Sequence, residues 1–308
     1  MLSMIGMIGG LILLIVLTMR GVNLLIAGPL SALFVAVLSG LPLFPQLVEE
    51  GEVNLLSNYM GGFSGFITSW FPMFLLGAIF GKVMEDTGAA DSVSKWLVGK
   101  FGLSKAVLAI VIACAVLTYG GVSLFVVAFS VYPMALSLFK QADLPRRFIP
   151  AALALGSVTF TMTSAGSPEI QNWIPIDYLN TSPYAGWEVS IIVAIFMAFF
   201  GYWWLKRMIN KAVKKGERFE ARESDPQMAD RALPHPMTGL IPLLVVLAVS
   251  FIFHDSLGTS ALILALLGGV ITTYLLNMKY FTNLGKALTD GTIGALIAIG
   301  NTAAVVGF

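Results

Sequence analysis

The stretch AVLAIVIACAVLTYGGVSLFVVAFSVYPMALSLF, residues 106–139, is a run of 34 residues without a charged side chain. It is interrupted at Tyr119-Gly120-Gly121, where two glycines allow a tight turn. The arm before the interruption, residues 106–118, has 13 residues, and such a helix is about 20 Å long. The hydrocarbon core of a bilayer is about 30 Å thick. One arm is therefore too short to cross it, which points to a re-entrant hairpin.

Flanking charges support the hairpin. Cytoplasmic loops next to membrane helices carry an excess of Lys and Arg, and Lys105 and Lys140 place both ends of the run inside. Two full spans remain the alternative. The other basic segments are also assigned to the cytoplasm, whereas the loops without Lys or Arg are assigned to the outside. The inside segments are 82–105, 140–147 and 206–236, and the outside loops are 45–60 and 164–187.

Composition sets the class of the whole chain. Of its 308 residues, 57% are hydrophobic and 11% are charged, against roughly a quarter charged in soluble domains. We therefore predict an all-α polytopic membrane protein embedded in a lipid bilayer. Uncharged segments long enough to span a bilayer are 1–19, 21–48 (core 22–44), 60–81, 148–168, 189–205, 237–253, 256–278 and 291–308.

Several other classes find no support. The formal net charge of +1 does not suggest a nucleic-acid partner. The single cysteine, Cys114, cannot form an intramolecular disulfide. No metal-ligand spacing, nucleophile motif or phosphate loop is visible, so neither an enzyme nor a cofactor is predicted.

The order of the spans suggests an inverted repeat, a feature of secondary transporters. The first two spans run inward and back, whereas those at 237–253 and 256–278 run outward and back. Each pair precedes a segment with a Gly-x-x-Gly start, Gly62/Gly65 and Gly291/Gly294. We predict one transporter domain with a first repeat at 1–205, a basic cytoplasmic loop at 206–236 and the start of a second repeat at 237–308. Because the second repeat is incomplete, we expect a C-terminally truncated chain.

A second interruption is the polar stretch TFTMTSAGSPEIQNW, residues 159–173. Irregular backbone at membrane depth must line a protein-enclosed cavity. We expect a helix over 148–162, a break at Gly166 and a short helix that begins at 168, with Ser167 as N-cap, and ends before Pro175. Its free N–H groups favour an anion. An outside loop with ordinary capping is the alternative.

Candidate substrate-binding residues lie at three polar breaks, the third at Gly300-Asn301-Thr302. Ser123 is expected to cap the helix after the first break, and the hydroxyl groups of Thr161 and its neighbours can bond a carboxylate or a sugar hydroxyl. The candidates are Tyr119, Gly120, Gly121 and Ser123; Thr163, Ser164, Gly166, Ser167, Gln171 and Asn172; and Asn301 and Thr302. Glu169 is either a proton carrier, since an acid near membrane depth often marks a proton path, or an ordinary first-turn charge.

The segment TYGGVSLFVVAFSVYPMALSLFKQADLPRRFIPAALALGSVTFTMTSAGSPEIQNWIP and the segment GKVMEDTGAAD resemble the gluconate permease (GntP) family of the ion-transporter superfamily. The resemblance extends over the whole chain and is most specific at 118–175. It implies proton symport of gluconate or a related hydroxy or sugar acid across a bacterial inner membrane. Family members are longer, which implies that a second hairpin and half of the substrate site are missing here.

Other functions remain open on the residues alone. One alternative is a sodium-coupled carrier or antiporter for another small carboxylate or a D-amino acid. A channel and a non-transporting membrane scaffold are alternatives of a different class. Assembly into a homo-oligomer is also left open, as is the identity of the organic acid.

Overall fold

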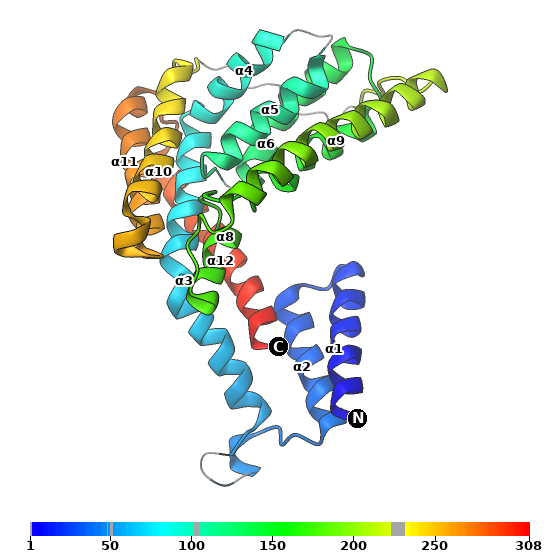
Figure 1. Cartoon of the computed structure of the whole chain (residues 1–308), viewed down its shortest axis with the longest axis vertical. Coiled ribbons are helices and arrows are strands. Elements are labelled where there is room, and N and C mark those ends of the chain that lie inside the picture. The colour runs from blue at the N-terminus through cyan, green and yellow to red at the C-terminus, as the bar shows by residue number, and fades with distance from the viewer. Residues whose placement is uncertain (1, 48, 50–51, 102–104, 123, 223–231) are drawn as a thin grey trace. The chain divides into compact units, whose positions relative to one another are not determined.

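The computed structural model describes residues 2–308 except 48, 50–51, 102–104, 123 and 223–231. The regular elements of these residues are all helical, which confirms the predicted fold class (Figure 1). In chain order they are α1 (Leu2–Met19), α2 (Leu24–Ser39), η1 (Pro45–Leu47), α3 (Leu55–Asp86), α4 (Ala89–Phe101), α5 (Ala106–Tyr119), α6 (Leu124–Gln141), η3 (Arg146–Phe148), α7 (Ile149–Ala154), η4 (Leu155–Thr159), α8 (Ile170–Leu179), α9 (Trp187–Lys214), α10 (Pro236–Leu257), α11 (Ser260–Asn277), η5 (Met278–Tyr280) and α12 (Leu284–Gly307).

The chain divides into two compact units. Unit 1 contains residues 1–75 and 292–308, and unit 2 contains residues 76–291. Helix α3 begins in unit 1 and ends in unit 2, whereas α12 begins in unit 2 and ends in unit 1. A helix pair followed by a long helix occurs at each end of the chain, as the repeat hypothesis requires. The inverted repeat itself stays a prediction.

In unit 1, α1 and α2 pack side by side as a helical hairpin (Figure 1). Asn23 caps α2, because its side chain accepts a hydrogen bond from the Leu25 N–H at 2.9 Å. Gly40 ends α2 in the left-handed region at φ 67°, and the Leu41 N–H closes the end on the Ala36 carbonyl at 2.9 Å. The predicted span over 21–48 is therefore too long, since its helix stops at Ser39.

In unit 2, α5 is the central helix and packs on α4, α6, α7 and η4. Many of its small and branched side chains are buried, and Ala109, Ile110 and Leu117 are fully so. Lipid tails are as apolar as leucine, so burial in a membrane gains its energy from close packing rather than from leaving water. The α10–α11 pair packs side by side in the same unit (Figure 1).

Helix α9 presents most of its apolar surface outward. Phe199 is 74% exposed and Ile192 is 68% exposed, which is unfavourable in water and ordinary in lipid. Among the described residues, five helices are long and apolar enough to cross a membrane, namely α3, α9, α10, α11 with η5, and α12. The chain is thus a multi-pass membrane protein.

The segment 148–168 does not form the predicted span. Helix α7 ends at Ala154, a π-helical turn η4 follows, and residues 160–169 are not helical. The Thr161 hydroxyl donates to the carbonyls of Gly156 and Ser157, at 2.8 and 2.9 Å. Side-chain hydroxyls that take backbone acceptors in this way compete with helix continuation. The helix therefore breaks earlier than the apolar pattern indicates.

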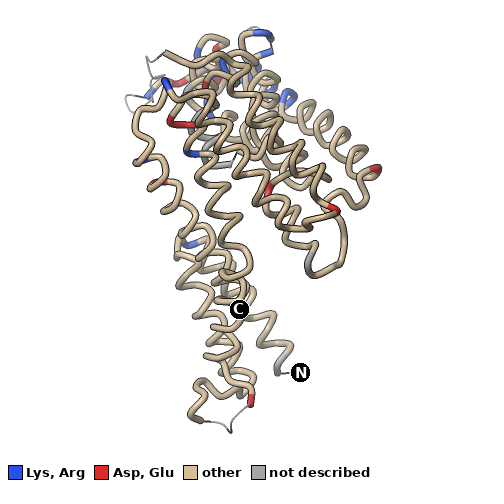
Figure 2. Tube along the Cα trace, turned by 90° about the vertical axis from the view of Figure 1, so that its left-hand side faces the viewer, with Lys and Arg blue, Asp and Glu red and all other residues tan. Residues whose placement is uncertain are grey.

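Charges gather at one end of unit 2, where the α6–α7 loop and the end of α9 lie (Figure 2). Helix α9 continues past Leu205 to Lys214, so the beginning of the predicted 206–236 loop is helical. At the start of α12, Asp86 accepts hydrogen bonds from the N–H groups of Thr282 and Asn283, at 3.0 and 3.2 Å. Asp86, at the end of α3, thus holds the turn before α12, whereas Asn283 caps the helix itself, because its Oδ1 accepts a hydrogen bond from the Lys286 N–H at 2.9 Å.

Candidate functional site

The first helix break lies at the end of α5. The Val122 N–H donates to the Leu117 carbonyl at 3.0 Å, which closes the helix end, and Gly121 takes φ +89°. Helix α6 begins at Leu124 and packs against α5. A helical hairpin with its tip at Tyr119-Gly120-Gly121 is therefore present, and its re-entrant course through the membrane stays a prediction. Ser123, predicted as the cap of the second arm, lies outside the described residues.

The second break spans residues 160–169 and is held by its own polar groups. Gly166 adopts φ +77°, and a Cβ atom there would overlap the Tyr184 ring. Only glycine fits this combination of backbone angle and close approach. The Ser164 hydroxyl donates to the Phe160 carbonyl, and the Gly166 N–H donates to the Pro183 carbonyl at 2.9 Å.

The short helix after this break differs from the prediction at both ends. It begins at Ile170, with Glu169 rather than Ser167 as N-cap, and it continues through Pro175 to Leu179. Ser167 is buried, and its carbonyl accepts the Asn172 Nδ2 at 3.2 Å and the Trp173 Nε1 at 2.9 Å. These two bonds hold the first residues of α8 against the backbone of Ser167, and the helix begins at Ile170 rather than at 168.

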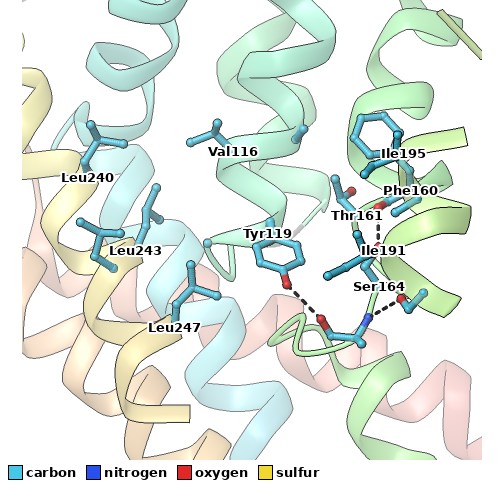
Figure 3. Close-up of a pocket in the computed structure, with 16 residues that line it drawn as sticks. Val116, Tyr119, Phe160, Thr161, Ser164, Ile191, Ile195, Leu240, Leu243 and Leu247 are labelled. Atoms are coloured by element: carbon cyan, nitrogen blue, oxygen red, sulfur yellow. Dashed lines mark hydrogen bonds between the residues drawn. The ribbon is translucent and has the colours of Figure 1, made fainter. Parts of the chain in front are cut away.

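The two breaks meet. The Tyr119 hydroxyl, at the hairpin tip, donates to the Ala165 carbonyl at 2.9 Å (Figure 3). The Ala165 N–H in turn donates to the Ser190 hydroxyl of α9 at 2.9 Å. The two breaks are also close in space, since a Cβ atom at Gly121 would lie 3.3 Å from Pro168. A side chain of the hairpin tip is thus bonded to the backbone of the second break. The irregular backbone is covered by protein, as it must be at membrane depth.

Several predicted binding groups are engaged within the protein. Asn172 Nδ2 also donates to the Pro183 carbonyl at 3.1 Å, so its amide braces the α8–α9 loop. Thr163 and Gln171 are exposed, and Ser167 is buried. The structure therefore brings Tyr119, the two glycines of the tip and residues 164–169 together, while Thr163 and Gln171 lie at the surface of the same segment.

Glu169 differs from its neighbours. Its Oε1 atom is buried and has no hydrogen-bond partner among the described residues, and its side chain makes no capping bond. The first turn of α8 favours negative charge at this position, whereas an unpartnered buried carboxylate is costly. A carboxyl group under these opposed influences is suited to gaining and losing a proton.

A pocket of about 470 Å³ adjoins the meeting point of the breaks (Figure 3). Tyr119, Thr161, Ser164 and Ser190 give it one polar side. The remaining wall is largely apolar and comes from α5, α9 and α10, with Val116, Ile191, Leu243 and Leu247 among its members. Glu169, Gln171 and Asn172 do not line this pocket, so the predicted site residues do not share one cavity in unit 2.

Sequence reasoning missed three residues at the second break. Tyr184 packs against Gly166, and its ring lies 4.6 Å from the His254 ring and 5.4 Å from the Phe251 ring. His254 is near the C-terminal end of α10, and its contact with Tyr184 helps to hold this loop against α10. Ser190 is a polar residue within the apolar run of α9, and that contrast was a signal that could have identified it.

The predicted helix break at Gly300-Asn301-Thr302 is wrong. Helix α12 runs without interruption from Leu284 to Gly307, and the Thr302 hydroxyl donates to the Ala298 carbonyl at 3.0 Å within it. The Asn301 Oδ1 is buried without a hydrogen-bond partner in the described part of the chain. Both residues belong to unit 1, and their role in binding stays a prediction.

The chain matches one protein family and several known proteins. The family model of the GntP family permeases matches residues 2–301. An uncharacterized transporter of Bacillus subtilis (strain 168), YxjC, is 36% identical, and the match covers 94% of this chain and 68% of that protein. An uncharacterized transporter of Haemophilus influenzae is 28% identical over 71% of this chain and 50% of its own length.

A third relative, the high-affinity gluconate transporter of Escherichia coli (strain K12), is 27% identical. That match covers 50% of this chain and 33% of the relative. No solved structure matches the chain. The three matches thus cover between 33% and 68% of the relatives' own lengths.

Proposed function

The chain belongs to the GntP permease family, whose members are transporters and not enzymes, and on that premise we propose that it carries a small organic anion across the bacterial inner membrane by proton symport. Gluconate or a related hydroxy or sugar acid is the proposed substrate class. The similarity to a gluconate transporter supports this class, and no separate cofactor is proposed beyond the coupling proton.

The meeting of two helix breaks carries the proposal. Secondary transporters place substrates where helices are interrupted, because half-helix ends and freed backbone groups can bind charge there. In this chain the Tyr119–Ala165 hydrogen bond joins the α5 hairpin tip to the segment that starts α8. A carboxylate near the first turn of α8 would accept hydrogen bonds from N–H groups that have no partner within the helix.

Glu169 is the proposed proton carrier. It is the N-cap of α8, and its buried Oε1 has no partner in the described residues. An anionic substrate at the start of α8 would repel an ionised Glu169 and favour its protonated form. Protonation and substrate binding would thereby be coupled, which is the requirement for symport.

Uptake of labelled gluconate into proteoliposomes tests the function. We expect accumulation above the external concentration when the outside is more acidic than the inside, both in sodium buffer and when choline replaces sodium. Uptake that needs sodium would identify the sodium-coupled carrier instead. Uptake that only equilibrates would identify a channel. The assay is run on this chain and on the longest product of its reading frame.

The variant Glu169→Gln tests the coupling role. We expect it to abolish accumulation driven by the proton gradient while leaving gluconate exchange between the two sides measurable. Glu188→Gln is the matched control, since Glu188 is an exposed glutamate in the first turn of α9. If the Glu169 variant accumulates gluconate normally with an unchanged pH profile, the proton is carried elsewhere.

A further inference from the structure

The pocket of about 470 Å³ beside the helix breaks is built on both of them. It extends from the hairpin tip, at Tyr119 and Gly120, to residues 160–165 of the second break. The next residue of the tip, Gly121, approaches Pro168, which lies just before the start of α8. The residues that line the pocket and those that lead into α8 are therefore neighbours at the same joint. The carbon chain of an anion bound at this joint is expected to enter the pocket.

The hydroxyl groups of the pocket lie on one side of it, and most of their protons are already donated within the protein. Tyr119, Thr161 and Ser164 each donate to a backbone carbonyl. The Ser190 hydroxyl instead accepts the Ala165 N–H at 2.9 Å, so its own proton can be donated to a ligand. This polar side can therefore bond a carboxylate edge or a single ligand hydroxyl, but it reaches only one face of a longer ligand.

The remaining wall consists of aliphatic side chains from α5, α9 and α10 (Figure 3). Val116, Leu243 and Leu247 belong to it. Leu243 is 3% exposed and packs directly against the hairpin tip, since a Cβ atom at Gly120 would lie 2.7 Å from its Cβ. A ligand hydroxyl placed against this wall loses its hydrogen bonds to water without gaining others, which weakens binding.

We propose that this pocket makes the chain selective for hydroxy acids with an aliphatic carbon chain over polyhydroxy acids such as gluconate. This selectivity rests on the proposed function, because it takes the substrate carboxylate to be bound at the helix breaks. A carboxylate and one hydroxyl next to it can face the polar side, while the other carbons contact the aliphatic wall. Gluconate carries a hydroxyl on every further carbon, so some of its hydroxyls must face that wall, and it is carried less efficiently.

Two acids with the same carbon skeleton, α-hydroxyhexanoate and gluconate, test the selectivity. Binding is measured by titration calorimetry on the full chain in phosphatidylcholine nanodiscs, with empty nanodiscs as the baseline. Uptake is measured in proteoliposomes with an imposed proton gradient. An apolar pocket rejects a ligand that adds one hydroxyl by up to about a hundredfold. We therefore expect α-hydroxyhexanoate to bind at least about tenfold more tightly than gluconate and to compete with the uptake of labelled gluconate.

The variant Leu247→Asn tests whether the aliphatic wall is the cause. Its amide can pair with ligand hydroxyls, so we expect the preference for α-hydroxyhexanoate to fall about tenfold. Leu267→Asn is the matched control, because Leu267 is 41% exposed on α11 and does not line the pocket. It should change the preference by less than about twofold, as expected for a site without shared contacts. Val116→Thr, which keeps the shape of the side chain, is a second variant of the wall if Leu247→Asn does not fold.

Binding and uptake separate a failure of the selectivity from a failure of the proposed function. If α-hydroxyhexanoate binds more tightly but neither acid accumulates, the selectivity of the pocket stands and the transport function is wrong. The selectivity is overturned if gluconate binds as tightly as α-hydroxyhexanoate or if neither acid binds, whatever the uptake assay gives. It is also overturned if Leu247→Asn and Leu267→Asn alter the preference equally, which would show that the pocket holds something other than the substrate, such as a lipid chain.

Discussion

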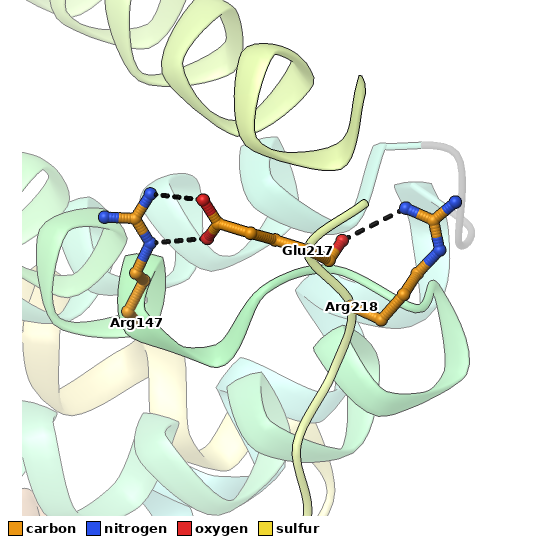
Figure 4. A network of polar contacts seen from close by, with 3 residues as sticks. All are labelled: Arg147, Glu217 and Arg218. Atoms are coloured by element: carbon orange, nitrogen blue, oxygen red, sulfur yellow. Dashed lines mark hydrogen bonds and ion pairs between the residues drawn. The ribbon is translucent and has the colours of Figure 1, made fainter. Parts of the chain in front are cut away.

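The helix breaks and the charged end of unit 2 are held together in opposite ways. At the helix breaks, backbone groups are satisfied by short neutral contacts such as the bond from the Tyr119 hydroxyl to the Ala165 carbonyl. At the charged end, neighbouring segments are joined by ion pairs between side chains, Arg147 with Glu217 (Figure 4) and Arg218 with Asp143. The pocket at the breaks is mainly apolar, whereas the pocket at the charged end, between the α6–α7 loop and residues 215–222, is lined by many charged side chains.

This difference follows from the surroundings of each pocket. In a bilayer an unsatisfied backbone group costs several kcal/mol, so a helix break there must be closed by nearby hydroxyls and carbonyls. In water the same groups are hydrated, and an exposed ion pair contributes only about 0–1 kcal/mol. We therefore expect the breaks to tolerate substitution poorly and the charged pocket to tolerate it well.

The largest effect is expected at Gly166. In Gly166→Ala the left-handed backbone costs about 1–2 kcal/mol and the clash with the Tyr184 ring adds about 1–3 kcal/mol. We predict a loss of about 3 kcal/mol in the free energy of unfolding, measured by thermal unfolding in detergent, and loss of uptake.

Gly186→Ala is the control for backbone strain alone. Gly186 also has a positive φ, of 65°, but a Cβ there would meet no described atom within 4 Å. We expect it to cost only about 1 kcal/mol. Equal effects of the two substitutions would show that the packing of Tyr184 on Gly166 contributes nothing.

An intermediate effect is expected from removing one hydroxyl in each pocket. Tyr119→Phe leaves the Ala165 carbonyl without its donor, which we expect to cost about 1–2 kcal/mol of stability and to lower the rate of gluconate uptake. Tyr132→Phe removes the acceptor of Arg146 Nη2 at the charged end, and we expect it to leave gluconate uptake unchanged. Equal loss of uptake in both variants would contradict a specific role of the Tyr119 contact.

The smallest effect is expected at the ion pair. Arg147 and Glu217 have side chains that are 64% and 36% exposed. A double-mutant cycle with Arg147→Ala and Glu217→Ala should give a coupling energy of about 0.5 kcal/mol, which declines as salt is added. A coupling above about 2 kcal/mol that resists salt would show that this end is as constrained as the helix breaks.

Much of the fold could be predicted because membrane helices leave strong signals. The apolar runs located every long helix, and the glycine pair at Gly120-Gly121 marked the end of α5. Helix ends were less predictable. The start of α8 depends on the Asn172 and Trp173 contacts with the Ser167 carbonyl, and such contacts form only when the chain has folded back on itself.

The candidate site was predicted less completely than the fold. Polar residues in an apolar run identified Tyr119 and the segment 164–169, since polar groups are costly in lipid. Tyr184, Ser190 and His254 were missed, because their role is to contact the break from other elements and no local pattern records such contacts. The apparent break at Gly300 was an error of the opposite kind, since glycine is tolerated inside α12.

The sequence by itself determined that this chain is an α-helical membrane protein, because hydropathy and the distribution of Lys and Arg are properties of local segments. The family was indicated separately, by the resemblance of segments such as 118–175 to the GntP permeases. Only the tertiary structure decided that the break after η4 rests on the hairpin tip, that Glu169 has a buried oxygen without a partner, and that residues 215–222 fold back onto the α6–α7 loop. Each of these depends on groups far apart in sequence, whose approach is set by the packing of helices around α5.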